Sequence, residues 1–263
     1  MNNTIHPSAV IEDGAEIGEN VTIGPFCHVG PQVKLGSGSE LKSHVAIHGD
    51  TTIGAGARIF PFASIGHEPQ DLKFTGEHTT LVIGDNCLMR EGVTINPGTG
   101  ADASNTTIGN NCVFLANSHV AHDCQVGNNV IFSNAVLLAG HCKVGNHVII
   151  GGGAAVHQFC RIGDNAFIGG LAGVENDLIP FGMALGNRAH LGGLNIIGMK
   201  RAGIERDSIH KARAVFKHIF SSGYTIKEAL ETVDPEKADD FVAGKIIQFI
   251  RDGADRSLCT PKG

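Results

Sequence analysis

Aliphatic side chains recur at every sixth residue along most of this 263-residue chain. They keep one register over residues 5–65 and 83–95, and after a shift of one residue they continue over residues 108–174. A period of six fits neither one face of an α-helix nor the strict alternation of an exposed strand. It predicts a mainly β protein, a parallel β-helix in which each hexapeptide forms one side of a coil.

A second register, two residues before the aliphatic one, prefers small side chains. Both registers should point inward, so that large and small side chains alternate and fill a narrow prism. The second register contains alanines, valines and six of the seven cysteines: Cys27, Cys87, Cys112, Cys124, Cys142 and Cys160. We therefore interpret these thiols as small buried hydrophobic groups, neither catalytic nor paired in disulfides, as in a reducing compartment.

Composition and charge narrow the class of protein. The first residues show no charged segment followed by an apolar one, and no apolar run approaches the ~20 residues that span a bilayer. We expect a soluble, cytoplasmic protein without stable membrane insertion. A net charge of −6 argues against nucleic acid as its partner.

The repeats predict two domains, a hexapeptide-repeat domain over residues 1–185 and a helical domain over residues 186–263. Two polar segments, 67–80 and 97–107, interrupt the repeats, which resume after each. We interpret them as loops extruded from the prism, and loops held on a rigid scaffold commonly carry binding residues.

The last 80 residues show helix punctuation. Asp207 or Ser208 is the predicted cap of a helix that ends near Gly223. Thr225 and Glu228 have the spacing of a capping box, and Asp234-Pro235 is predicted to open a last helix that continues to Ile250.

Three hexapeptides make one coil, so residues 18 apart should stack at the ~4.8 Å spacing of neighbouring strands. His122, Gly140 and Gln158 are related in this way, and so are Asp123, His141 and Phe159. Together with His119 and His157 they form the densest polar cluster of the chain. Hydrogen-bonded surface histidines, a zinc site, or a general base beside a carboxylate each fit this cluster.

Basic side chains concentrate between Lys200 and His218. Six basic and two acidic residues give this segment a charge of +4. It is either an ordinary solvated helix face or a landing surface for an acidic partner, where complementary charge mainly accelerates encounter.

These features closely resemble the UDP-N-acetylglucosamine O-acyltransferases of lipid A biosynthesis, over essentially the whole chain. The resemblance rests on the hexapeptide prism together with five segments: Gln70–Phe74, His119–Cys124, Ala139–His141, Val156–Cys160, and the helical tail with Asn195 and Lys200-Arg201. The chain departs from the family at Ile197, where members often carry Glu.

The resemblance implies a left-handed β-helix with a small C-terminal helical domain, assembled as a homotrimer with active sites between neighbouring prisms. It also implies transfer of an (R)-3-hydroxyacyl group from acyl carrier protein to the glucosamine 3-hydroxyl of UDP-N-acetylglucosamine. The acyl group would arrive on the carrier's phosphopantetheine, so neither a cofactor nor a metal of the enzyme's own is expected.

Residue roles follow from the resemblance position by position. His122 corresponds to the general base, Asp123 to the carboxylate that orients it, and Gly140 to the backbone N–H that stabilises the oxyanion. The implied substrate-binding residues are Asp71, Lys73, His119, His141 and Gln158 at the sugar nucleotide or acyl chain, His157, Asn195 and Arg201 at the nucleotide end, and Gly170 at the floor of the acyl pocket.

Three other functions compete with this hypothesis. A related acyltransferase would use an amine acceptor or a coenzyme A donor, and the Gln70–Phe74 insert and the basic tail argue against it. A carbonic anhydrase built on the same prism would need a histidine zinc site, for which Asp123 and Gly140 are less suited than for base and oxyanion roles. A binding scaffold would leave the outer wall without the polar cluster.

Overall fold

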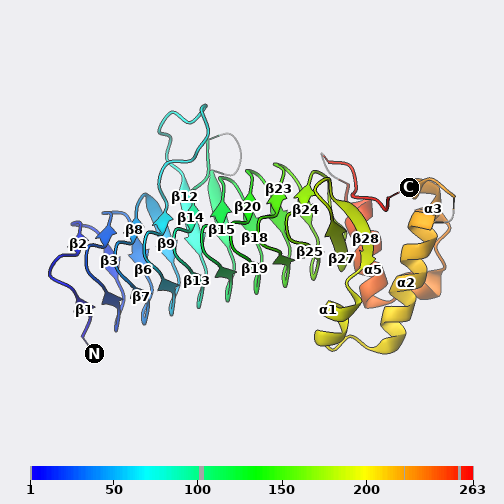
Figure 1. Ribbon diagram of the computed structural model, residues 1–263, viewed down its shortest axis with the longest axis horizontal. Coiled ribbons are helices and arrows are strands. Elements are labelled where there is room, and N and C mark those ends of the chain that lie inside the picture. Colours follow the sequence, from blue (N-terminus) through cyan, green and yellow to red (C-terminus); the bar gives the residue numbers. More distant parts are fainter. Residues whose placement is uncertain (1, 101–103, 222, 254–255, 263) are drawn as a thin grey trace.

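The structure is a computed structural model that describes residues 2–100, 104–221, 223–253 and 256–262. A long prism of stacked coils runs from the N-terminal end to a group of helices at the other end, and a loop projects from one side (Figure 1). The predicted fold, a left-handed parallel β-helix of hexapeptide repeats with helices at its C-terminal end, is confirmed.

Short strands in regular order form the three faces of the prism, which we call sheets A, B and C. Sheet A contains β1 (Thr4–Ile5), β4 (Thr22–Ile23), β7 (Glu40–Leu41), β10 (Arg58–Ile59), β13 (Leu88–Met89), β16 (Val113–Phe114), β19 (Ile131–Phe132), β22 (Ile149–Ile150), β25 (Phe167–Ile168), β27 (Gly182–Leu185) and β28 (His190–Leu194). Sheet B contains β2 (Val10–Ile11), β5 (His28–Val29), β8 (Ala46–Ile47), β11 (Ser64–Ile65), β14 (Thr94–Ile95), β17 (His119–Val120), β20 (Leu137–Leu138), β23 (Ala155–Val156) and β26 (Gly173–Val174). Sheet C contains β3 (Glu16–Ile17), β6 (Lys34–Leu35), β9 (Asp50–Ile53), β12 (Thr80–Ile83), β15 (Asn105–Ile108), β18 (Gln125–Val126), β21 (Lys143–Val144) and β24 (Arg161–Ile162). All these strands pair in parallel except β27 with β28, which are antiparallel.

The core is the interior of the prism, and both predicted inward registers line it. Large side chains such as Phe114 and Phe132 are fully buried, with ring centroids 5.1 Å apart in an edge-to-face arrangement. The six cysteines of the small register are free and buried, as predicted, and Cys259 near the C-terminus is free and buried as well. Alternation of large and small side chains therefore fills the interior, and the outward positions remain available for function.

Corners of the coils need backbone with positive φ, a conformation that glycine adopts most easily. The structure places asparagine at many of these corners as well. The asparagines with positive φ are Asn20, Asn86, Asn111, Asn117, Asn129 and Asn165. Asparagine visits this region at lower cost than most residues because its short polar side chain can bond locally.

Both predicted loops leave the prism at the corner between sheets B and C. The first connects β11 to β12, and the second connects β14 to β15 on the next coil. The strands that follow pair over four residues, with Thr80 opposite Asn105. The first loop projects from this edge (Figure 1), and the described parts of the second, residues 97–100 and 104, leave and rejoin the prism on the next coil, while residues 101–103 lie outside the described residues.

Five helices cover the C-terminal end among the described residues: α1 (Ile196–Arg201), α2 (Arg206–Ser221), α3 (Ile226–Glu231), α4 (Pro235–Ala238) and α5 (Phe241–Arg251). The capping box of Thr225 and Glu228 is confirmed at the start of α3. The predicted cap of α2 is wrong, because the helix begins before Asp207 and that carboxylate instead pairs with Lys211 one turn later.

The predicted last helix is also wrong in one respect, since it is two helices. Asp234 caps α4 as expected, but a second cap at Asp240 starts α5. The Asp240 carboxylate accepts the backbone N–H groups of Val242 and Ala243 at 2.9 and 3.1 Å, which breaks the helix and restarts it.

Polar side chains attach the helices to the prism. At the corner between sheets C and A, Asn128 Oδ1, Asn146 Oδ1 and Asp164 Oδ1 each accept a backbone N–H from the coil before. Asp164 Oδ2 then accepts a hydrogen bond from Lys245 Nζ of α5 at 2.7 Å. Within the described residues, no helix is long and apolar enough to cross a bilayer.

Candidate active site

The residues predicted to be catalytic lie at the corner between sheets B and C, on successive coils. His122 and Asp123 lie between β17 and β18, and Gly140 and His141 lie between β20 and β21. His141 N–H donates to the His122 carbonyl at 3.0 Å, and Phe159 N–H donates to the Gly140 carbonyl at 3.1 Å. The predicted stacking of residues 18 apart is confirmed in the adjoining strands of sheet B, where His119 pairs with Leu137 and Leu137 with Ala155.

His122 and Asp123 form a directed pair. His122 Nδ1 lies 2.9 Å from Asp123 Oδ2, and the side chains are 13% and 1% exposed. An ionised carboxylate only accepts hydrogen bonds, so the proton of the imidazole belongs on Nδ1. The lone pair of His122 Nε2 is then available for a substrate proton.

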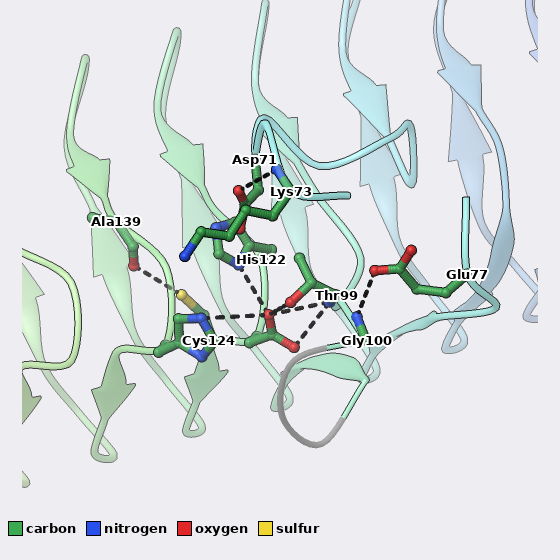
Figure 2. A network of polar contacts seen from close by, with 10 residues as sticks. Asp71, Lys73, Glu77, Thr99, Gly100, His122, Cys124 and Ala139 are labelled. Carbon is green, nitrogen blue, oxygen red and sulfur yellow. Dashed lines mark hydrogen bonds and ion pairs between the residues drawn. The ribbon is translucent and has the colours of Figure 1, made fainter. Parts of the chain in front are cut away.

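Thr99 fixes the carboxylate from the second extruded loop. Its N–H donates to both oxygens of Asp123 at 3.0 and 3.1 Å, and its hydroxyl donates to Oδ2 at 2.7 Å (Figure 2). With backbone and side chain taken together, Thr99 is 2% exposed and Asp123 is 6% exposed. A buried carboxylate that accepts this many hydrogen bonds keeps one orientation.

Gly140 lies directly beneath the His122 imidazole. A Cβ placed on Gly140 would lie 2.6 Å from His122 Cε1 and 2.8 Å from Nε2. Glycine is therefore required sterically by the position of the ring. Among the described residues, the Gly140 N–H donates to no backbone or side-chain acceptor, so it is free to bind a ligand oxygen.

A cavity of about 680 Å³ opens between this edge and the first extruded loop. It is lined by Gln70, Asp71, Leu72, Lys73, His122, His141, Gln158 and Phe159. Figure 2 shows Asp71 and Lys73 extending from the loop on the side of His122. The ring of Phe159 stacks on that of His141 with centroids 4.6 Å apart, which gives the polar cavity one apolar wall.

His119 lies beside the cavity, facing outward from sheet B. Its Nδ1 is 2.7 Å from the Thr94 hydroxyl. Burial lowers the pKa of His119 from its ordinary value, and the nearby charge of His122 lowers it further. His119 is therefore a neutral hydrogen-bonding group at neutral pH.

Other predicted substrate residues lie away from this cavity. Gly170 lies at the opposite corner, between sheets A and B, on an exposed stretch of backbone. Asn195 caps α1 through a bond from the Gly198 N–H, and Arg201 is exposed in the last turn of that helix. Their roles stay predictions.

Arg256, in the tail that follows α5, was not found by sequence reasoning. Its Nη2 lies 2.7 Å from His157 Nδ1, and its Nε donates to the Gln158 carbonyl at 3.1 Å. Thr99 was also missed, although it lies in a loop that the repeats had set apart. Because that loop leaves the same corner as His122, its coil position was a usable signal. No comparable pattern surrounds Arg256.

The site also has the donors of a metal site. His122, Asp123 and His141 offer ligand atoms within 4.8 Å of one another, so the zinc alternative keeps a structural basis. The cysteines near the site, Cys124, Cys142 and Cys160, are buried inside the prism and so offer no nucleophile, and burial raises the pKa of the Cys160 thiol to about 12.

Comparison with known proteins places the chain in a family. A family model described as UDP-N-acetylglucosamine O-acyltransferase domain 2 matches residues 177–259, and one for bacterial transferase hexapeptides matches residues 1–31, 14–49 and 105–140. Acyl-[acyl-carrier-protein]–UDP-N-acetylglucosamine O-acyltransferases from Mesorhizobium japonicum and Rhizobium johnstonii are 57% and 53% identical. They match over 99% and 98% of this chain and 94% of each relative.

Solved structures agree with these relatives. The UDP-N-acetylglucosamine O-acyltransferase of Moraxella catarrhalis superimposes with a TM-score of 0.93 at 42% identity, over 97% of this chain and 99% of that one. The acyltransferase of Francisella novicida gives 0.95 at 36% identity, over 99% and 95%. This chain is therefore a member of the UDP-N-acetylglucosamine O-acyltransferase family, as its sequence motifs predict.

Proposed function

We propose that this acyltransferase moves an (R)-3-hydroxyacyl group from acyl carrier protein to the glucosamine 3-hydroxyl of UDP-N-acetylglucosamine, the first step of lipid A biosynthesis. The names of its relatives supply the donor and the acceptor. The observation that carries the proposal is the His122–Asp123 pair, whose imidazole lies over Gly140 at a cavity large enough for part of a sugar nucleotide.

In this proposal His122 Nε2 takes the proton of the sugar hydroxyl as its oxygen attacks the thioester carbonyl. A new C–O bond forms, and the carbonyl oxygen becomes an oxyanion that the Gly140 N–H stabilises. Collapse breaks the C–S bond, and the thiolate of the carrier's phosphopantetheine takes the proton back from His122. The acyl group arrives already activated, so the reaction uses no cofactor of the enzyme's own.

The cavity supplies contacts of the expected kind. Asp71, Lys73, His141 and Gln158 line it, and they offer charged and neutral groups for the hydroxyls and phosphates of the acceptor. His119 and His157 lie beside it. Gly170, Asn195 and Arg201 are proposed to act from a neighbouring prism.

A homotrimer would bring such a neighbour close. Sheet A supports this proposal, because its outward positions are apolar on six successive coils, at Leu88, Val113, Ile131, Ile149, Phe167 and Met183. A continuous apolar stripe along a face is typical of a surface that packs against protein. Sheet C carries exposed polar outward residues such as Gln125 and Lys143, as expected for a face in water. We also propose a cytoplasmic location.

The basic residues of α2 are proposed to receive the acidic carrier protein. Arg206 and Lys217 are exposed, and Lys211 is partly exposed and paired with Asp207. Reversing each charge should raise the apparent KM for acyl carrier protein, and more so at low salt, because exposed charges are screened over ~8–10 Å at physiological ionic strength. Unchanged kinetics at low salt for all three variants would show that this helix face is an ordinary solvated surface and does not bind the carrier protein.

The test of the reaction is a mass-resolved assay that offers hydroxyacyl carrier proteins of several lengths to the 3-hydroxyl acceptor and to its 3-amino analogue. His122→Ala should lower the rate by ~10²–10⁴-fold, the usual contribution of a general base. His147→Ala is the matched control, since His147 is exposed at the corner between sheets C and A. Normal turnover by His122→Ala would refute the mechanism, and stoichiometric zinc in active protein would favour the metal alternative.

A further inference from the structure

The two extruded loops are joined to each other. Glu77, near the end of the first loop, accepts the Gly100 N–H of the second loop at 2.9 Å through Oε1 (Figure 2). Its other oxygen accepts the N–H and hydroxyl of Thr75, each at 2.9 Å. Glu77 thus closes a turn in its own loop and binds the neighbouring loop.

The bond lies next to the residue that holds the catalytic carboxylate. Gly100 follows Thr99 directly, and Thr99 gives Asp123 three hydrogen bonds in a buried environment. On the other side, Glu77 belongs to the loop that carries Asp71 and Lys73 into the cavity. A continuous path of bonded groups therefore runs from the substrate loop to the base.

We propose that Thr99 and Glu77 are positioning residues for the reaction: Thr99 orients His122 through Asp123, and Glu77 ties that orientation to the substrate loop. The proposal rests on the proposed function, because it takes His122 as the base. Neither residue touches the reacting atoms.

The Glu77 end of the path keeps one charge state. The N–H of Gly100, with further backbone donors in its own turn, holds the pKa of Glu77 at about 2, so this carboxylate remains an acceptor near neutral pH. At the other end, Thr99 occupies both oxygens of the buried Asp123, which leaves Oδ2 directed at His122 Nδ1.

Thr99→Val tests the first half. Valine keeps the shape and the backbone N–H and removes only the hydroxyl. We expect kcat to fall about 10–100-fold, the cost of removing an outer-shell group that orients a metal-ligating histidine, with the KM for the sugar nucleotide changed less than about twofold. Without this hydroxyl, the negative charge on Asp123 Oδ2 is less dispersed and should stabilise the protonated form of His122 more strongly. The acidic limb of the plot of kcat/KM against pH should therefore move to higher pH. Thr99→Ser, which restores a hydroxyl, should recover most of the rate and the original limb.

Glu77→Ala tests the second half. It frees both loops, so we expect a higher KM for the sugar nucleotide together with a lower kcat. Glu77→Gln keeps an acceptor for the Gly100 N–H and should recover most of both. Glu68→Ala is the matched control, because Glu68 lies on the same loop and its side chain makes no hydrogen bond among the described residues.

Each outcome decides one question. Thermal melts of every variant separate a lost fold from a lost orientation. If His122→Ala remains active, the base assignment and the proposed function fail together. If His122→Ala is inactive but Thr99→Val keeps a normal kcat and an unmoved acidic limb, only the positioning role of Thr99 is wrong. A Glu77→Ala variant that matches Glu68→Ala overturns the coupling of the loops.

Discussion

Replacing Gly140 by alanine is the sharpest single perturbation of the candidate site. The added Cβ would lie 2.6 Å from His122 Cε1, whereas ordinary contacts begin at 3.4 Å, so the imidazole or the backbone must move by about 0.8 Å. A misplacement of about 1 Å can cost 10²-fold in rate, and we expect a loss of that order in kcat. Gly140 has no positive φ, so alanine should raise the free energy of unfolding slightly, by about 0.4–1 kcal/mol, before the cost of the contact.

The assay is single-turnover acyl transfer with saturating donor and acceptor, accompanied by a thermal melt. Gly30→Ala is the matched control at the same edge of the prism. A Cβ at Gly30 would meet its nearest atom, the Ile47 carbonyl oxygen, at 3.4 Å, so that variant should keep normal turnover. If Gly140→Ala turns over at the normal rate with an intact melt, the His122 ring is not held over Gly140 during the reaction, and its assignment as the base loses its geometric support.

Three further predictions concern stability and specificity. Burial, and then the charge of His28, lowers the pKa of His48, and burial likewise lowers that of His67. The unfolded chain binds more protons below its histidine pKa of about 6.5, so the melting temperature should fall as the pH drops from about 7 to about 5, and His48→Asn should flatten that dependence in calorimetry. Asp240→Ala removes the cap of α5, and urea unfolding should show a loss of about 1–2 kcal/mol. Gly170→Met should shift the ratio of kcat/KM values toward shorter acyl donors with little change in stability, because a Cβ there meets only the Gly152 backbone, with the carbonyl oxygen at 3.4 Å and the nitrogen at 4.0 Å. An unchanged preference would show that Gly170 does not limit chain length.

The repeating part of the molecule could be predicted almost residue by residue. In a coil of 18 residues, each inward position is set by periodicity alone, and the alignment of His122 with Gly140 and Gln158 follows from the same count. The helical end was harder to predict, because a single polar side chain, that of Asp240, determines where one helix ends and the next begins. Apolar spacing continues past Asp240, and only the bonds from Val242 and Ala243 show that a new helix starts there.

The residues of the candidate site that lie on the prism were predicted from the sequence. Those contributed by the second loop and by the tail, Thr99 and Arg256, were missed. His122 and Asp123 are fixed by the coil, whereas Thr99 reaches Asp123 only because its loop folds back over the edge. Arg256 contacts His157 across nearly a hundred residues of sequence. Long-range contacts of this kind leave no periodic trace, so a single sequence could not reveal them.

Stacked strands at the edge between sheets B and C are joined by chain segments of very different length. Residues paired across sheet B are 30 apart from Ser64 to Thr94, 25 apart from Thr94 to His119, and 18 apart from His119 to Leu137, and yet the side-chain register is the same. Within a face, by contrast, a single added residue would turn every inward side chain outward. Lengthening a flexible loop costs little, about 0.6 kcal/mol for each doubling. Insertions and deletions can therefore accumulate at the edge that lines the candidate cavity, whereas the strands of each face tolerate them poorly, so that the loops can diverge without any change in the scaffold.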